Sequence, residues 1–166
     1  MRPQQIPTAP DLDAVRVRRQ SLRAAMGAFE AALAAPAVGR ISEWTPGLVV
    51  ALQQLDTCLK EHVAATEGPD GFHSQIVTAS PRLYHGVTVL VADHQRATEL
   101  LDQLRRATND ARTDGQVSGI REQGTEMLAL LVKHRQREPA WDVLRSALLS
   151  RKNRPQGIGH NAVTSV

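Results

Sequence analysis

The segment SPRLYHGVTVLVADHQRATELLDQL (80–104) decides the fold class, because its apolar residues return every three or four positions. This spacing places apolar side chains on one face of an α-helix, whereas a half-buried strand would need strict alternation. Ser80 and Pro81 form a typical helix start, with a capping side chain followed by proline at the first helical position. The apolar stripe comprises Leu83, Val87, Leu90, His94, Ala97, Leu101 and Leu104. The segment therefore predicts an amphipathic helix that carries a histidine on its apolar face.

The same spacing predicts two helices on the N-terminal side of this segment. The first extends from about 11 to 35. The second begins at Thr45 and Pro46, which repeat the start signal, and ends before Gly68. The residues 70–79 read as a connecting loop that contains at most a short turn. Two amphipathic helices are thus expected before the central one.

A fourth helix is expected on the C-terminal side. The polar stretch 109–115 reads as a connection, and the apolar spacing then resumes over 120–148. Pro139 interrupts this pattern and should kink the helix or start a fresh one, since proline removes a backbone hydrogen bond.

Four amphipathic helices joined mostly by short loops predict an all-α fold. The arrangement expected for them is an antiparallel, up-down-up-down four-helix bundle. The bundle is expected to span 11–150 as one domain, which is long enough for a hydrophobic core. We expect flexible termini at 1–10 and 151–166.

The composition argues against several classes of function. No apolar run approaches the roughly 20 residues that cross a bilayer, and 1–10 lacks the apolar region of a secretory signal. The single Cys58 excludes an intramolecular disulfide framework, so a reducing cytoplasm is the simplest compartment.

No nucleic-acid partner is expected, because the net charge is only +3 and aromatic residues, which could stack on bases, make up only 3% of the chain. No phosphate loop, paired-cysteine motif or nucleophile elbow is present, so no catalytic residues are assigned.

Three histidines fall on the apolar stripes of three different predicted helices, namely His62, His94 and His134. Imidazole is the commonest metal ligand, and helical bundles build metal sites from side chains on facing helices. Glu138 follows His134 by four residues and shares its face, where a carboxylate is costly unless it is paired or binds a cation. These residues predict a metal site. The alternative is a set of hydrogen-bonded core histidines, with Glu138 paired to an arginine.

The other histidines are expected outside this site. His85 lies about 160–200° around the helix from the apolar stripe. It remains the reserve candidate because its expected position along the bundle axis is closer to that of His62 than the position of His94 is. For His62 and His94 to meet, the third helix must begin beyond the end of the second. His73 in the loop and His160 in the tail are expected to be solvated.

At these positions the sequence resembles the hemerythrin-like, or HHE cation-binding, family of four-helix bundles. The resemblance covers about 12–148 and rests on the motifs HVAATE (62–67), DHQRATELL (93–101) and HRQRE (134–138). It implies a non-haem iron centre, mononuclear or di-iron, that binds or senses oxygen, nitric oxide or a related redox ligand. It also implies a ligand set of His62, Glu67, His94, His134 and Glu138.

The chain departs from the family pattern in its first helix. That helix normally supplies an inward histidine, whereas Arg18, Arg19 and Gln20 stand at about the matching level here. Glu67 is also rotated by about 100° from the helix face on which the family places its carboxylate. Two functions therefore stay open: a metal-binding module, and a metal-free hemerythrin-like bundle that acts as an interaction or regulatory domain. A hydrolytic or redox enzyme is a third alternative, for which no residue specifies a substrate.

Overall fold

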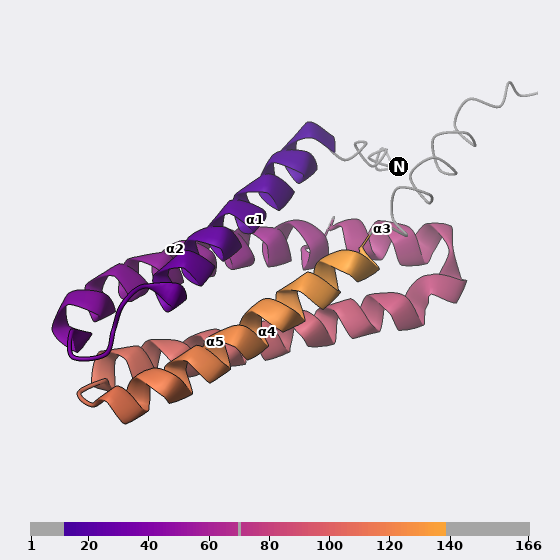
Figure 1. Ribbon diagram of the computed structural model, residues 1–166. Coiled ribbons are helices and arrows are strands. Elements are labelled where there is room, and N and C mark those ends of the chain that lie inside the picture. The colour runs from indigo at the N-terminus through magenta and orange to yellow at the C-terminus, as the bar shows by residue number, and fades with distance from the viewer. Residues whose placement is uncertain (1–11, 70, 139–166) are drawn as a thin grey trace, which may run out of the picture.

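The computed structural model describes residues 12–69 and 71–138, and these residues form helices and short connections without strands (Figure 1). The helices are α1 (Leu12–Ala34), α2 (Ile41–Glu67), α3 (Phe72–Ala79), α4 (Tyr84–Asp110) and α5 (Asp114–Arg137), with a 3-10 turn, η1 (Pro81–Leu83), before α4. The all-α prediction is confirmed. The predicted termini at 1–10 and 151–166, and the predicted helix beyond Pro139, lie outside the described residues.

The four long helices enclose one hydrophobic core. α1 packs along α2, α2 packs along α4, α4 packs along α5, and α5 contacts α1. Each helix presents its apolar stripe to this core, and burial of these stripes drives the association. The largest fully buried side chains of this core are Leu22, Phe29, Leu48, Leu52, Leu55, Leu100, Leu101, Leu104, Ile120, Met127 and Leu131. Among the described residues, no helix has the length and apolar character that a membrane span requires.

α2 begins one turn earlier than the sequence predicts. Trp44 is buried, and its indole N–H donates a hydrogen bond to the carbonyl of Ala32 at 2.8 Å. The backbone N–H of Trp44 bonds to the carbonyl of Arg40, so the helix extends ahead of Pro46. The predicted start at Thr45 was wrong, because packing of Trp44 against α1 outweighs the backbone hydrogen bond that Pro46 removes.

The segment predicted as a connecting loop is largely the helix α3. Ile76 of α3 is buried against Leu90 of α4, and Phe72, Leu83 and Val87 pack around this pair. A helix of this length is unstable by itself, so this small second core holds it. The loop prediction was wrong because the stabilising contacts come from α4, which lies outside the segment.

α3 also sets the height at which α4 begins. It carries the chain onward from the end of α2 before η1 and α4 follow (Figure 1). α4 therefore starts beyond the end of α2, which is the condition that the sequence set for His62 and His94 to meet.

The contact between α1 and α5 gives a paired stability prediction. A Cβ on the buried Gly124 would lie 2.5 Å and 2.8 Å from the two terminal methyl carbons of Leu33, whereas a Cβ on Gly119 would meet nothing within 4 Å. Gly124→Ala is expected to destabilise the protein by about 1–2 kcal/mol, because overpacking exceeds the gain in helix propensity. Gly119→Ala gains helix propensity without a steric cost, and it is expected to stabilise the protein by about 0.5–1 kcal/mol. Urea unfolding checks both, and equal shifts of the two variants would contradict the close contact.

Candidate metal centre

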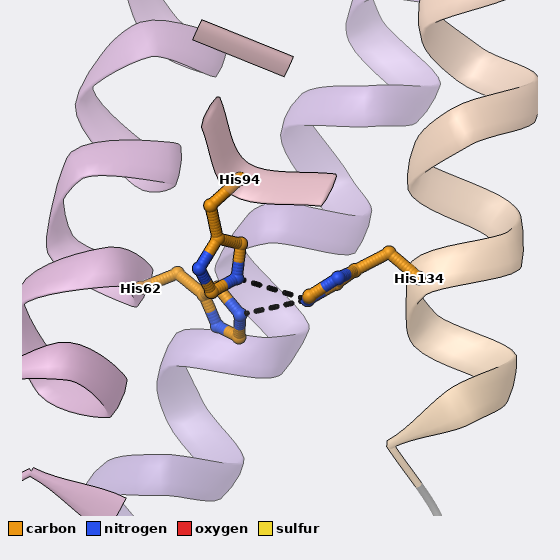
Figure 2. A group of neighbouring side chains, drawn as sticks. All are labelled: His62, His94 and His134. Carbon is orange, nitrogen blue, oxygen red and sulfur yellow. Dashed lines mark hydrogen bonds between the residues drawn. The ribbon is translucent and has the colours of Figure 1, made fainter. Parts of the chain in front are cut away.

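The three predicted histidines meet inside the bundle. His62 comes from α2, His94 from α4 and His134 from α5, and they are 4%, 3% and 1% exposed. Figure 2 shows the three rings pointing toward one another. The Nε2 atom of His134 lies 3.3 Å from Nε2 of His62 and 3.1 Å from Nε2 of His94. One ring nitrogen from each histidine lies within 4.8 Å of the other two.

The spacing of these nitrogens suits a single ion. Nitrogen ligands about 2.0–2.1 Å from a tetrahedral ion lie about 3.3–3.4 Å from one another. The two Nε2–Nε2 distances, 3.3 Å and 3.1 Å, are close to this value. Imidazole nitrogens suit first-row metals such as iron, zinc and copper. The arrangement therefore has the chemistry and the dimensions of a metal site.

Glu138 adds a carboxylate to the same point. Its Oε1 atom lies 3.3 Å from Nε2 of His62 and 3.6 Å from Nε2 of His134. The backbone N–H of Glu138 bonds to the carbonyl of His134, so the helical geometry that links the two positions persists beyond the last residue of α5. The other carboxylate oxygen, Oε2, lies 3.7 Å from Nε of Arg19. Oε1 of Glu138 thus lies beside the histidine nitrogens as a possible fourth donor, while Oε2 faces Arg19 of α1.

Glu67 lies behind a histidine instead of among the converging nitrogens. Its Oε1 atom is 2.5 Å from Nδ1 of His94, the ring nitrogen that does not face His134. A carboxylate at Nδ1 holds the proton on that nitrogen and leaves Nε2 free to bind a metal. The resemblance implied that Glu67 is a metal ligand, whereas its carboxylate is the hydrogen-bond partner of His94 at the ring nitrogen that does not face His134.

Asp93 lies near Nδ1 of His134 but makes no hydrogen bond with it, and we did not predict this contact. Its Oδ2 atom lies 3.5 Å from Nδ1 of His134 and accepts a 2.7 Å hydrogen bond from Arg137. Being one residue before His94, Asp93 projects about 100° around α4 from it, toward α5. The signal was present in the sequence as an acidic residue directly before a histidine of the apolar stripe.

The remaining histidines divide into buried and exposed. His73 was expected to be solvated, but it lies on α3 and is 6% exposed. Its ring stacks on that of His94, with centroids 5.9 Å apart and planes 6° apart. This expectation was wrong because it depended on 70–79 being a loop. His85 is exposed on α4, as expected, and His160 lies outside the described residues.

Burial sets the protonation state of the cluster. It lowers the pKa of His62 to about 4, although the Glu138 carboxylate opposes this shift. Burial also lowers the pKa of His94, although the hydrogen bond that Nδ1 donates to Glu67 opposes this shift. In Glu138 burial raises the pKa, but the hydrogen bond with His134 and the nearby His62 more than offset it, so the pKa is lowered. Near neutral pH the site holds neutral His62 and His94 imidazoles beside a carboxylate, the forms that bind metals.

These shifts predict how the metal-free protein responds to acid. The pKa of His62 is about 4 when folded and about 6.5 when unfolded, so the unfolded chain binds more protons between these values. The contribution of His62 to stability is therefore complete above about pH 6.5, is lost as the pH drops toward 4 and does not change further below that value. The shift of His62 alone corresponds to roughly 3 kcal/mol.

Urea unfolding at pH 7, 5.5 and 4 measures this loss. The variant His85→Gln, on the exposed face of α4, is the control and should retain the full pH dependence. Equal unfolding midpoints at all three pH values would contradict the shift.

The cluster opens to the surface on the side of α1. Two pockets reach it, and both are lined by Arg19, His62 and Glu138. Arg18 lines the first pocket, while Arg23 and Arg135 line the second. The side of the cluster that faces α1 is thus an arginine-lined opening.

Comparisons of this chain with protein families, with curated proteins and with solved structures found no match.

Proposed function

We propose that this protein is a hemerythrin-like, antiparallel up-down-up-down bundle that binds non-haem iron and uses it to bind or sense oxygen, nitric oxide or a related redox ligand. The observation that carries the proposal is the convergence of three buried Nε2 atoms from three helices. The order of helix contacts, α1 with α2, α2 with α4, α4 with α5 and α5 with α1, supports the bundle. The proposed ligands are His62, His94, His134 and Glu138.

The donor set supports a single first-row metal ion. Neutral imidazoles and one carboxylate suit iron as well as zinc. Glu67 accepts a hydrogen bond from Nδ1 of His94 and would fix the orientation of that ring. The Asp93 carboxylate lies 3.5 Å from Nδ1 of His134 and adds negative charge beside that ring. Bound iron would supply an open coordination position for a small ligand. The opening beside His62 and Glu138 gives such a ligand a path from the surface.

Elemental analysis of protein expressed with added iron tests the proposal. We expect about one iron per chain, since the nitrogen spacing suits one ion. The reduced protein should then change its absorption spectrum when oxygen or nitric oxide is added. Zinc in place of iron would overturn the choice of metal, and protein that takes up no metal would overturn the metal site.

A second function, a metal-free bundle that acts as an interaction or regulatory domain, is favoured by one specific contact. The guanidinium of Arg19 lies 3.7 Å from Glu138 and can balance its charge without an ion. A chelator separates the two functions. Removal of iron from the metal-binding form should lower the melting temperature, because a ligand bound only by the folded state stabilises it. In the second case the chelator should leave the melting temperature unchanged.

The residues behind the ligands give a further prediction. Glu67→Gln is expected to weaken metal binding about 10–100-fold, because such a partner fixes the ring and raises its basicity. Asp93→Asn is expected to weaken it less, because the Asp93 carboxylate lies 3.5 Å from Nδ1 of His134 and makes no hydrogen bond with it. The controls are Glu61→Gln and Asp102→Asn, which make the same changes at exposed positions of the same helices. Competition with a coloured chelator measures the affinity. Equal affinities in test and control variants would contradict the orienting role.

A further inference from the structure

The arginine-lined opening on the α1 side carries an inference about what binds there. Arg18, Arg19, Arg23 and Arg135 line the two pockets that reach His62 and Glu138. Three of these arginines come from α1 and one from α5. Both pockets end on residues that we propose as metal ligands, so a molecule in this opening would lie beside the metal.

The positive charge of this opening exceeds its negative charge. Arg19 faces Glu138 at 3.7 Å. Among the described residues, Arg18, Arg23 and Arg135 have no carboxylate within ion-pair distance. Within residues 12–69 and 71–138, Glu138 is the single carboxylate that lines either pocket. Four guanidinium groups therefore surround one carboxylate, and a metal cation would increase the excess further.

A neutral diatomic molecule makes no use of this charge, but an oxyanion does. A guanidinium group presents parallel N–H donors that match two oxygens of a carboxylate or of an inorganic oxyanion. We propose that the opening binds a small oxyanion beside the metal, held by the arginines of α1 and α5. This inference rests on the proposed metal site and assigns the ligand class of its open side.

Cobalt(II)-loaded protein, whose visible spectrum reports the metal surroundings, provides the test. Acetate and sulfate are the probes, one for each type of oxyanion, and chloride at equal ionic strength is the reference. We expect saturable binding of acetate or sulfate, seen by calorimetry and in the spectrum, with no comparable effect of chloride. Acetate alone or sulfate alone would identify the carboxylate or the inorganic type.

Variants of the opening locate the binding. Arg23→Ala and Arg135→Ala are each expected to weaken oxyanion binding about tenfold or more, through loss of a charged hydrogen bond, with the cobalt content unchanged. Arg106→Ala, which removes the same charge from an exposed position of α4 outside both pockets, is the control and should bind as the wild type does.

The outcomes separate this inference from the proposed function. Protein that binds cobalt but responds equally to oxyanions and chloride overturns the oxyanion site and leaves the metal site standing. Equal weakening by Arg106→Ala and the two pocket variants also overturns it, since the effect would then be one of net charge. Protein that binds no metal overturns the proposed function and this inference together.

Discussion

Replacing His134 by alanine is expected to weaken metal binding by more than about 100-fold, since structural metal sites derive roughly 10–16 kcal/mol from about four ligands. His134 is the central member of the cluster. Its Nε2 atom makes the two short contacts, 3.3 Å to His62 and 3.1 Å to His94, and Oε1 of Glu138 lies 3.6 Å away. Without His134, the other proposed ligands, His62, His94 and Glu138, lose the one side chain that lies close to all of them. Competition with a coloured chelator measures the loss.

His85→Ala is the matched control, because it removes a histidine from the exposed face of α4. It should leave the metal content unchanged. Circular dichroism separates loss of metal from loss of fold in the His134 variant. Unchanged metal content in His134→Ala would show that the cluster is a set of core histidines.

Phe29→Ala is expected to lower the free energy of unfolding by about 3–5 kcal/mol, the usual cost of removing a buried aromatic ring. Phe29 is 0% exposed and belongs to the main core. It lies on α1, which packs against α2 and also contacts α5. The cavity would therefore open where the first helix joins the rest of the bundle. Urea unfolding at neutral pH measures the change.

Val50→Ala is the control for this core prediction. Val50 is 63% exposed on α2, and a surface change of this kind should alter stability by less than about 0.5 kcal/mol. A loss below about 1 kcal/mol for Phe29→Ala would contradict the packing of α1, because cavities in well-packed cores cost more than that. Phe29 lines neither pocket, so the folded variant should retain its metal affinity.

The sequence determined the all-α class and the inward direction of His62, His94 and His134. Both follow from the spacing of apolar residues, because a helix buries one face and that face repeats every 3.6 residues. Glu138 follows from the same rule, as it is four residues from His134 on one helix face. These statements concern one helix at a time, and local spacing is sufficient for them.

The tertiary structure alone decided how these helices stand against one another. Burial of Trp44 against α1 moved the start of α2, and packing of Ile76 on α4 turned the expected loop into α3 and buried His73. The same packing placed Glu67 at Nδ1 of His94 instead of beside the converging Nε2 atoms. The height and rotation of one helix relative to another depend on side chains from distant parts of the chain, and no local pattern records them. The sequence therefore determined which residues face inward, while the packing of the helices decided which of them meet.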